Sequence, residues 1–225
     1  MLAIIIFEIL FIILSYTAFF LSSKVYKKFK KPYFHTIIIS VIVIITFLAI
    51  FHIDYQFYYN NTRVLRFLLD ISVVAFGYLL YLNIDFLKKN TFTILFANFL
   101  GSSVGIVSVL LLSKILNASK IVQASLIPKS ITTPLAVEIS SKLGGIAPLT
   151  AVIVILCGLF GAIIGPSLFK ILNIQSPLAR GIALGTSAHG LGTAKALEFG
   201  ALEGAVGGIS IGLMGFFTSI LSTYC

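Results

Sequence analysis

Apolar residues run almost unbroken along the chain and are interrupted only by short polar loops. A helix needs about 20 mainly apolar residues to cross the hydrocarbon core of a bilayer. Eight segments approach this length, at about 3–22, 33–53, 64–82, 91–113, 118–140, 147–171, 178–198 and 204–223. The pattern therefore predicts an all-α polytopic membrane protein with about eight transmembrane or re-entrant helices.

The composition supports a membrane environment. Of the 225 residues, 59% are hydrophobic and 10% are charged, whereas soluble domains carry about 25% charged residues. The chain therefore lacks the polar side chains that would cover a water-soluble surface. We expect a single integral membrane domain over residues 1–225, with the lipid bilayer as its main surrounding. The net charge of +9 lies mostly in loops and does not indicate a nucleic-acid partner.

The loop charges give a partial indication of orientation. Five lysines lie in "KVYKKFKK" at 24–31, which the positive-inside rule assigns to the cytoplasm. If all eight segments cross, both termini lie outside. The loop at 86–90 agrees with this orientation, whereas Lys170 and Arg180 fall on the outer side and disagree. The charges therefore leave the orientation of the termini open.

The hydropathy pattern also suggests a duplication. A shift of 116 residues superposes the first four segments on the last four, so that the repeat halves are about 1–116 and 117–225. Pro32 then falls on Pro148, and each proline opens the second segment of its half. Secondary transporters often place their substrate site between such halves. The halves would be parallel if every segment crosses, and inverted if 64–82 and 178–198 only enter and return.

The stretch "IPKSITTPLAVEIS" at 127–140 places a lysine at the centre of a predicted span. Pro128 and Pro134 each remove a helix hydrogen bond, so we expect a broken helix there. The gap between the prolines contains three hydroxyl residues, Ser130, Thr132 and Thr133. Lys129, hydroxyls and free backbone groups together suit a midplane anion site. The alternative is a kinked helix in which Lys129 pairs with a buried acid. Glu138 lies nearer the segment end, where it can reach interfacial water.

A second polar region, at 179–200, is dense in glycine and has His189 near its centre. Small residues surround this histidine: Gly185, Thr186, Ser187, Gly190, Gly192 and Thr193. We expect an interrupted helix that lines a cavity, with His189 suited to proton coupling because imidazole titrates near physiological pH. The alternative is a packing histidine without a role in coupling.

Enzymatic motifs are absent from the sequence. There is no His-Glu-x-x-His and no Gly-x-Ser-x-Gly, and Ser130 and Lys129 do not face each other on a helix because they are adjacent. Cys157 and Cys225 have neither metal-ligand nor disulfide spacing. The sequence therefore predicts that the protein is not an enzyme and uses no metal or other cofactor.

The motifs Pro-Lys-Ser-x-Thr-Thr-Pro at 128–134 and His-Gly-x-Gly-Thr-Ala at 189–194 resemble those of the LrgB/CidB family of bacterial membrane proteins. The resemblance covers essentially the whole chain and is strongest over 123–215. It implies a multi-pass protein of the bacterial cytoplasmic membrane. The family's site positions correspond to Lys129, Ser130, Thr132, Thr133, Pro134, His189, Gly190, Gly192 and Thr193.

The sequence departs from the family pattern at "DISVVAFGYLLY", 70–81. The family usually has two prolines in this span and a glycine where this chain has Asp70. We therefore expect a more continuous helix here. Asp70 either pairs with Arg66 one turn earlier or reaches Lys129 and gates anion binding.

Two functions follow from the resemblance. The first is a proton-coupled transporter of small carboxylates, of the pyruvate, acetate, glycolate or glycerate type, with Lys129 as the anion site. The second is a holin-like or antiholin-like regulator of murein hydrolase activity and autolysis. The expected partners are a small organic anion, a small LrgA/CidA-type membrane protein, and further copies of the chain in a homo-oligomer.

Overall fold

The computed structural model describes residues 2–29, 34 and 36–225, and over these residues the chain is helical without any β-strand. The helices are α1 (Leu2–Phe29), α2 (Thr36–Ile50), α3 (Tyr55–Asn60), α4 (Arg63–Leu82), α5 (Ile84–Lys89), α6 (Thr91–Ile115), α7 (Lys120–Leu126), α8 (Thr133–Lys142), α9 (Ala147–Ile171), α10 (Pro177–Leu197) and α11 (Ala201–Leu221), followed by a 3-10 turn (Ser222–Tyr224). The prediction of an all-α fold is confirmed.

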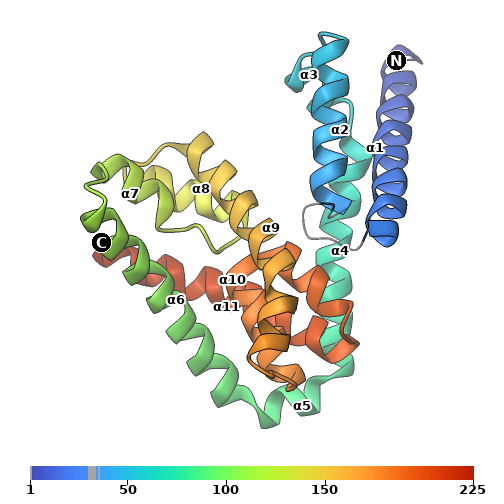
Figure 1. Cartoon of the computed structure of the whole chain (residues 1–225). Coiled ribbons are helices and arrows are strands. Elements are labelled where there is room, and N and C mark those ends of the chain that lie inside the picture. The colour runs from blue at the N-terminus through green and yellow to red at the C-terminus, as the bar shows by residue number, and fades with distance from the viewer. Residues whose placement is uncertain (1, 30–33, 35) are drawn as a thin grey trace. The chain divides into compact units, whose positions relative to one another are not determined.

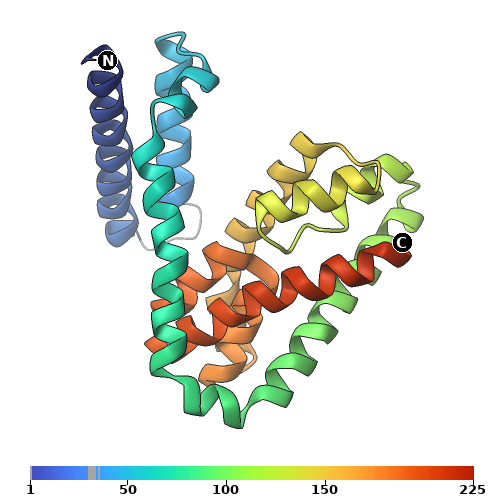
Figure 2. The ribbon, with the colours of Figure 1, turned by 180° about the vertical axis from the view of Figure 1, so that it is seen from behind.

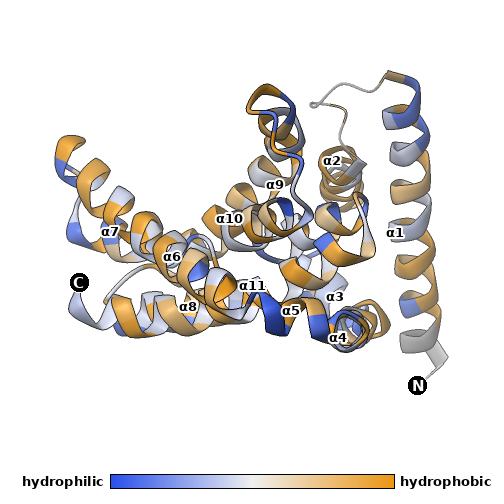
Figure 3. Cartoon of the chain, turned by 90° about the horizontal axis from the view of Figure 1, so that it is seen from below, coloured by the Kyte–Doolittle hydropathy of each residue, from blue (hydrophilic) through white to orange (hydrophobic). Residues whose placement is uncertain are grey.

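Four helices within the described residues are long and apolar enough to cross a membrane. They are Ile6–Phe29, Thr91–Ile115, Ala147–Ile171 and Ala201–Tyr224. Figure 3 shows hydrophobic residues along the long helices. These helices support a membrane protein, whereas the arrangement of eight segments in two repeats stays a prediction. Contacts divide the chain into two compact units, Met1–Ala75 and Phe76–Cys225.

The first unit contains α1, α2, α3 and the start of α4. Phe11 of α1 is 1% exposed and contacts Phe57 and Tyr58 of α3 in edge-to-face geometry. The Ser15 Oγ lies 2.9 Å from the Tyr58 hydroxyl. α4 is one continuous helix, as the missing prolines predict. The side chains of Arg66 and Asp70 lie outside the described residues, so the predicted gate remains a hypothesis.

The second unit contains two helical hairpins, and the first is α7, the turn at 127–132, and α8. Pro128 lies in the turn, and Pro134 occupies the first turn of α8, where its missing N–H costs nothing. The turn is held by hydrogen bonds from the Lys129 N–H to the Leu126 carbonyl, and from the Ile131 N–H to the Pro128 carbonyl. At 7 and 10 residues, neither α7 nor α8 is long enough to cross a bilayer. The predicted break in 118–140 is confirmed.

Hydrogen bonds of hydroxyl groups connect both arms of the first hairpin to the start of α9. The Thr150 Oγ1 lies 3.0 Å from the Ser125 carbonyl and 2.6 Å from the Ser140 Oγ. The Ile146 N–H donates to the Ser125 Oγ at 2.8 Å. Thr150 is fully buried, so it joins α7 and α8 to α9 at one point.

Replacing Thr150 by valine should destabilise the protein by about 1–3 kcal/mol, because the valine removes a buried hydroxyl and leaves its partners unpaired. Thermal unfolding in detergent measures this loss. Thr17→Val is the control, since Thr17 is exposed and bonds only to carbonyls of its own helix. An equal change in both variants would contradict the role of Thr150.

The second hairpin lies within α10. The backbone leaves helical geometry at Ala188 (φ −134°, ψ 17°) and His189 (φ 41°, ψ −130°). A Cβ placed on Gly192 would collide with the Leu184 carbonyl, although eight residues of straight helix span about 12 Å. The arms Pro177–Ser187 and Gly190–Leu197 therefore fold back on each other, and the predicted interruption is confirmed.

The two hairpins enter the second unit from opposite ends. The first follows the C-terminal end of α6, where Ile127 packs with Ile106 and Val109. The second lies at the N-terminal end of α6, where Ile182 packs with Ile94. Figures 1 and 2 show α6 and α9 running in opposite directions, with the first hairpin leading into α9 and the second leading out of it. Discontinuous helices near the centre of the fold are typical of secondary transporters.

Candidate functional site

Both hairpin turns lie beside the middle parts of long apolar helices. A Cβ placed on Gly105 of α6 would lie 3.9 Å from the Lys129 Nζ. The Cys157 thiol of α9 lies within electrostatic range of the same amine. Gly105 and Cys157 each lie in the middle part of a helix of 25 residues, about 15 Å from its nearer end. The Lys129 amine therefore lies beside the middle part of α6, a helix long and apolar enough to cross a membrane.

Lys129 lacks a counter-ion among the side chains that the structure describes. Its Nζ lies 3.5 Å from the Ser130 Oγ, and the ion pairs in this part of the chain involve other lysines. The alternative of a buried acid paired with Lys129 is therefore not seen among these side chains. Glu138 instead pairs with Lys142 at 2.7 Å on the exposed side of α8. A lysine at the centre of a span costs about 2.5–3.5 kcal/mol, and a bound anion would offset that cost.

The other predicted residues of the first hairpin differ in their surroundings. Ser130, Thr132 and Thr133 are partly buried, and Pro134 is exposed. Thr132 is the residue before α8, and its side chain makes no capping bond. Of these residues, Ser130 alone contacts the Lys129 amine among the described hydrogen bonds. Of the residues predicted for an anion site, the structure therefore brings Ser130 to Lys129, and the anion site stays a prediction.

A hydrogen bond of His189 attaches the second turn to α9. Its Nε2 lies 3.0 Å from the Val154 carbonyl, and the side chain is buried. A Cβ placed on Gly158 would lie 2.5 Å from that nitrogen, so the ring requires a glycine at this position of α9. Since a carbonyl only accepts, Nε2 carries the proton of this bond. The Nδ1 atom is then the nitrogen left to bind a ligand or a second proton.

The residues after His189 face in different directions. A Cβ placed on Gly190 would meet no atom within 4 Å, whereas Gly192 lies tightly against the first arm of α10. The Thr193 Oγ1 is buried without a hydrogen-bond partner and faces Gly207 of α11. Thr193 therefore belongs to the contact with α11, on a different side from the Val154–Gly158 surface.

The structure thus places His189 against Val154 and Gly158 of α9 and Lys129 beside Gly105 of α6. Sequence reasoning did not identify Gly105, Val154 or Gly158 as neighbours of these two residues. The available signal was the small-residue spacing along α9, where Gly158 precedes Gly161 and Gly165. In the described part of the chain, no group of three metal-ligating side chains occurs.

Four helices long and apolar enough to cross a membrane, together with two opposed hairpins whose turns are polar, are features of a polytopic membrane protein. A model of the LrgB-like family matches residues 15–225. The chain belongs to the LrgB-like family.

Similar proteins cover nearly the full length of the chain. The Staphylococcus aureus holin-like protein CidB is 33% identical over 214 residues, which are 95% of this chain and 93% of that protein. The Bacillus subtilis antiholin-like protein LrgB is 31% identical over 93% of this chain and 91% of its own length. YxaC of Bacillus subtilis is 36% identical over 91% and 89%. No solved structure gives a significant match.

Proposed function

We propose that the protein is a holin-like or antiholin-like component of the bacterial cell membrane. The main support for this proposal is the near-full-length similarity to proteins named holin-like and antiholin-like. In this proposal the protein acts with a small LrgA/CidA-type partner and regulates murein hydrolase activity by changing membrane permeability. The names of these relatives favour this function over carboxylate transport, which is the first function expected from the sequence.

A second candidate, transport of small carboxylates, is favoured by Lys129. The amine lies beside Ser130 and Gly105 of α6, without an acidic partner among the described side chains. Broken helices in transporters direct backbone dipoles at an anionic substrate. In this mechanism Lys129 binds the carboxylate, the neighbouring hydroxyls complete its hydrogen bonds, and His189 carries the coupled proton. The two candidates are compatible within one complex.

Proteoliposomes with and without the small partner distinguish the candidates. A holin-like component should release a fluorescent dye of unrelated structure, and the release should depend on the partner. A transporter should take up one of pyruvate, acetate, glycolate or glycerate saturably while retaining the dye. Absence of partner-dependent release, together with unchanged autolysis in cells lacking the protein, would contradict the first proposal. Equal uptake of every carboxylate and the dye would contradict the second.

A further inference from the structure

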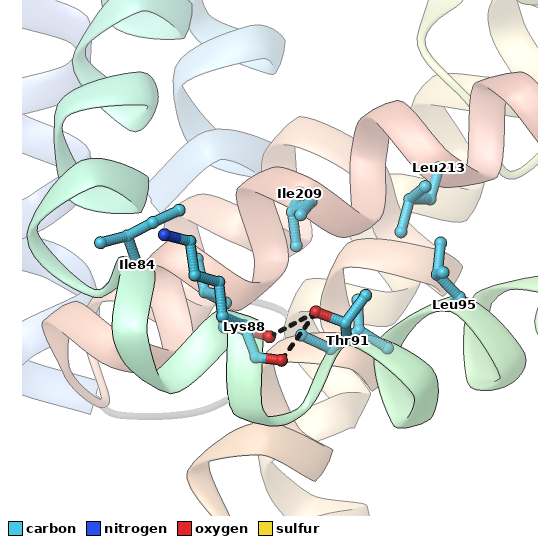
Figure 4. Close-up of a pocket in the computed structure, with 8 residues that line it drawn as sticks. Ile84, Lys88, Thr91, Leu95, Ile209 and Leu213 are labelled. Atoms are coloured by element: carbon cyan, nitrogen blue, oxygen red, sulfur yellow. Dashed lines mark hydrogen bonds between the residues drawn. The ribbon is translucent and has the colours of Figure 1, made fainter.

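A separate groove lies between α5, α6 and α11, away from the two hairpin turns. Its volume is about 250 Å³. Its walls are almost entirely apolar, and the residues that form them are Ile84, Leu87, Lys88, Thr91, Ile94, Leu95, Ile209 and Leu213. Figure 4 shows Ile84 and Lys88 at one end of the groove and Leu95 and Leu213 at the other.

The one hydroxyl in the groove is turned to the backbone. The Thr91 Oγ1 lies 3.1 Å from the Leu87 carbonyl and 2.9 Å from the Lys88 carbonyl, as the dashed lines in Figure 4 show. The hydroxyl proton is therefore donated to backbone carbonyls between α5 and α6 and is not free to bind an occupant of the groove. Apart from Lys88, the groove offers only hydrocarbon to an occupant.

Lys88 gives the groove a charged end. In the described part of the chain, no carboxylate lies within ion-pair distance of its amine. The neighbouring residues Asn83, Asp85, Lys89 and Asn90 are also polar. Because α5 directly precedes the candidate span Thr91–Ile115, we infer that Lys88 lies near the membrane surface. A phospholipid has a charged head group and apolar acyl chains. The cation at one end of the groove and its apolar walls correspond to these two parts.

We propose that this groove binds an anionic phospholipid, with the phosphate group at Lys88 and an acyl chain along α6 and α11. An acyl chain fits because the walls offer no hydrogen-bonding group beyond Lys88. An anionic head group fits because a lysine near a membrane surface attracts anionic lipid. A soluble anion alone would leave the apolar part of the groove unfilled.

The test of the head group compares two neighbouring lysines. Detergent-purified protein is incubated with phosphatidylglycerol or phosphatidylcholine of identical acyl chains, and native mass spectrometry measures the lipid retained. The wild type should prefer phosphatidylglycerol, and Lys88→Gln should lower that preference about fivefold, the ratio that about 1 kcal/mol per surface lysine gives. Lys89→Gln removes the same charge from the same turn outside the groove and should retain the preference.

The test of the acyl chain uses a second pair of variants on α6. Leu95→Trp fills the groove and should lower retention of both lipids, whereas Leu111→Trp, at another exposed leucine of α6, should not. Glycerol phosphate, which lacks acyl chains, should not bind measurably. Equal loss in Lys88→Gln and Lys89→Gln, or no effect of Leu95→Trp, would overturn the proposal. A change in oligomeric state with Leu95→Trp at unchanged lipid retention would also overturn it and assign the groove to a protein contact.

Discussion

In the proposed transport of small carboxylates, replacing Lys129 by glutamine is expected to reduce their uptake into proteoliposomes at least about thirtyfold. The amine lies beside Ser130 and Gly105, and it is the only cation in the turn at 127–132. Removing one partner of a buried charged pair costs about 2–5 kcal/mol or more. Glutamine keeps the length and polarity of the side chain but not its charge. Initial rates of labelled carboxylate uptake measure the effect.

Lys142→Gln is the matched control for this prediction. Lys142 lies in the same hairpin, but its side chain is 73% exposed and pairs with Glu138, and such surface pairs contribute about 0–1 kcal/mol. Uptake by this variant should be unchanged. Both variants should insert equally and retain their thermal stability. Full uptake by a well-folded Lys129→Gln protein would contradict the anion site, whereas partner-dependent dye release tests the holin-like function independently.

The second large effect is expected on stability, from adding a single methyl group to the second hairpin. Gly192→Ala should destabilise the protein by about 1–3 kcal/mol through overpacking. Its Cβ would collide with the Leu184 carbonyl and lie 2.7 Å from the Ala188 Cβ. Because backbone atoms form one side of this contact, the collision can be removed only if the two arms of α10 separate. Thermal unfolding in detergent measures the loss.

Gly190→Ala provides the internal comparison. Gly190 is two residues earlier in the same family motif, but a Cβ there meets no atom within 4 Å. Alanine is favoured over glycine in helices by about 1 kcal/mol, so this variant should be as stable as the wild type or slightly more so. Similar stability of the two alanine variants would show that the arms of α10 do not pack as closely as described.

The breaks in the two hairpins could be predicted from the sequence because their causes are local. Pro128 and Pro134 interrupt the segment at 118–140, and the glycine-rich run around His189 permits the turn in α10. The packing of these turns against α9 could not be predicted. It depends on contacts between segments far apart in the chain, such as His189 with Val154.

The short helices α3 and α5 were also not anticipated. They have six residues each, too few for a hydropathy pattern to reveal. The Asp54 carboxylate accepts hydrogen bonds from backbone N–H groups in the first turn of α3, and this cap is a recognisable local signal. α5 has no such side-chain cap.

A further sequence signal accompanies the opposed hairpins. The tetrapeptide Lys-Ile-Leu-Asn occurs at 114–117 and again at 170–173, at the ends of α6 and α9. Asn117 and Asn173 both have φ of 51°, the left-handed conformation that commonly ends a helix. Ser119 and Ser176 then cap the helices that begin the two hairpins. This spacing of 56 residues differs from the 116-residue shift that the hydropathy pattern suggests.

The attachment of the first hairpin to Thr150 has a consequence for biosynthesis. Thr150 follows both arms of the hairpin in the chain, so during synthesis α7 and α8 emerge from the ribosome before the residue that holds them together. Neither arm is long enough to be inserted as a span by itself, and Lys129 opposes its own transfer into lipid. The order of the chain therefore implies that this hairpin takes its final place only after α9 has been inserted.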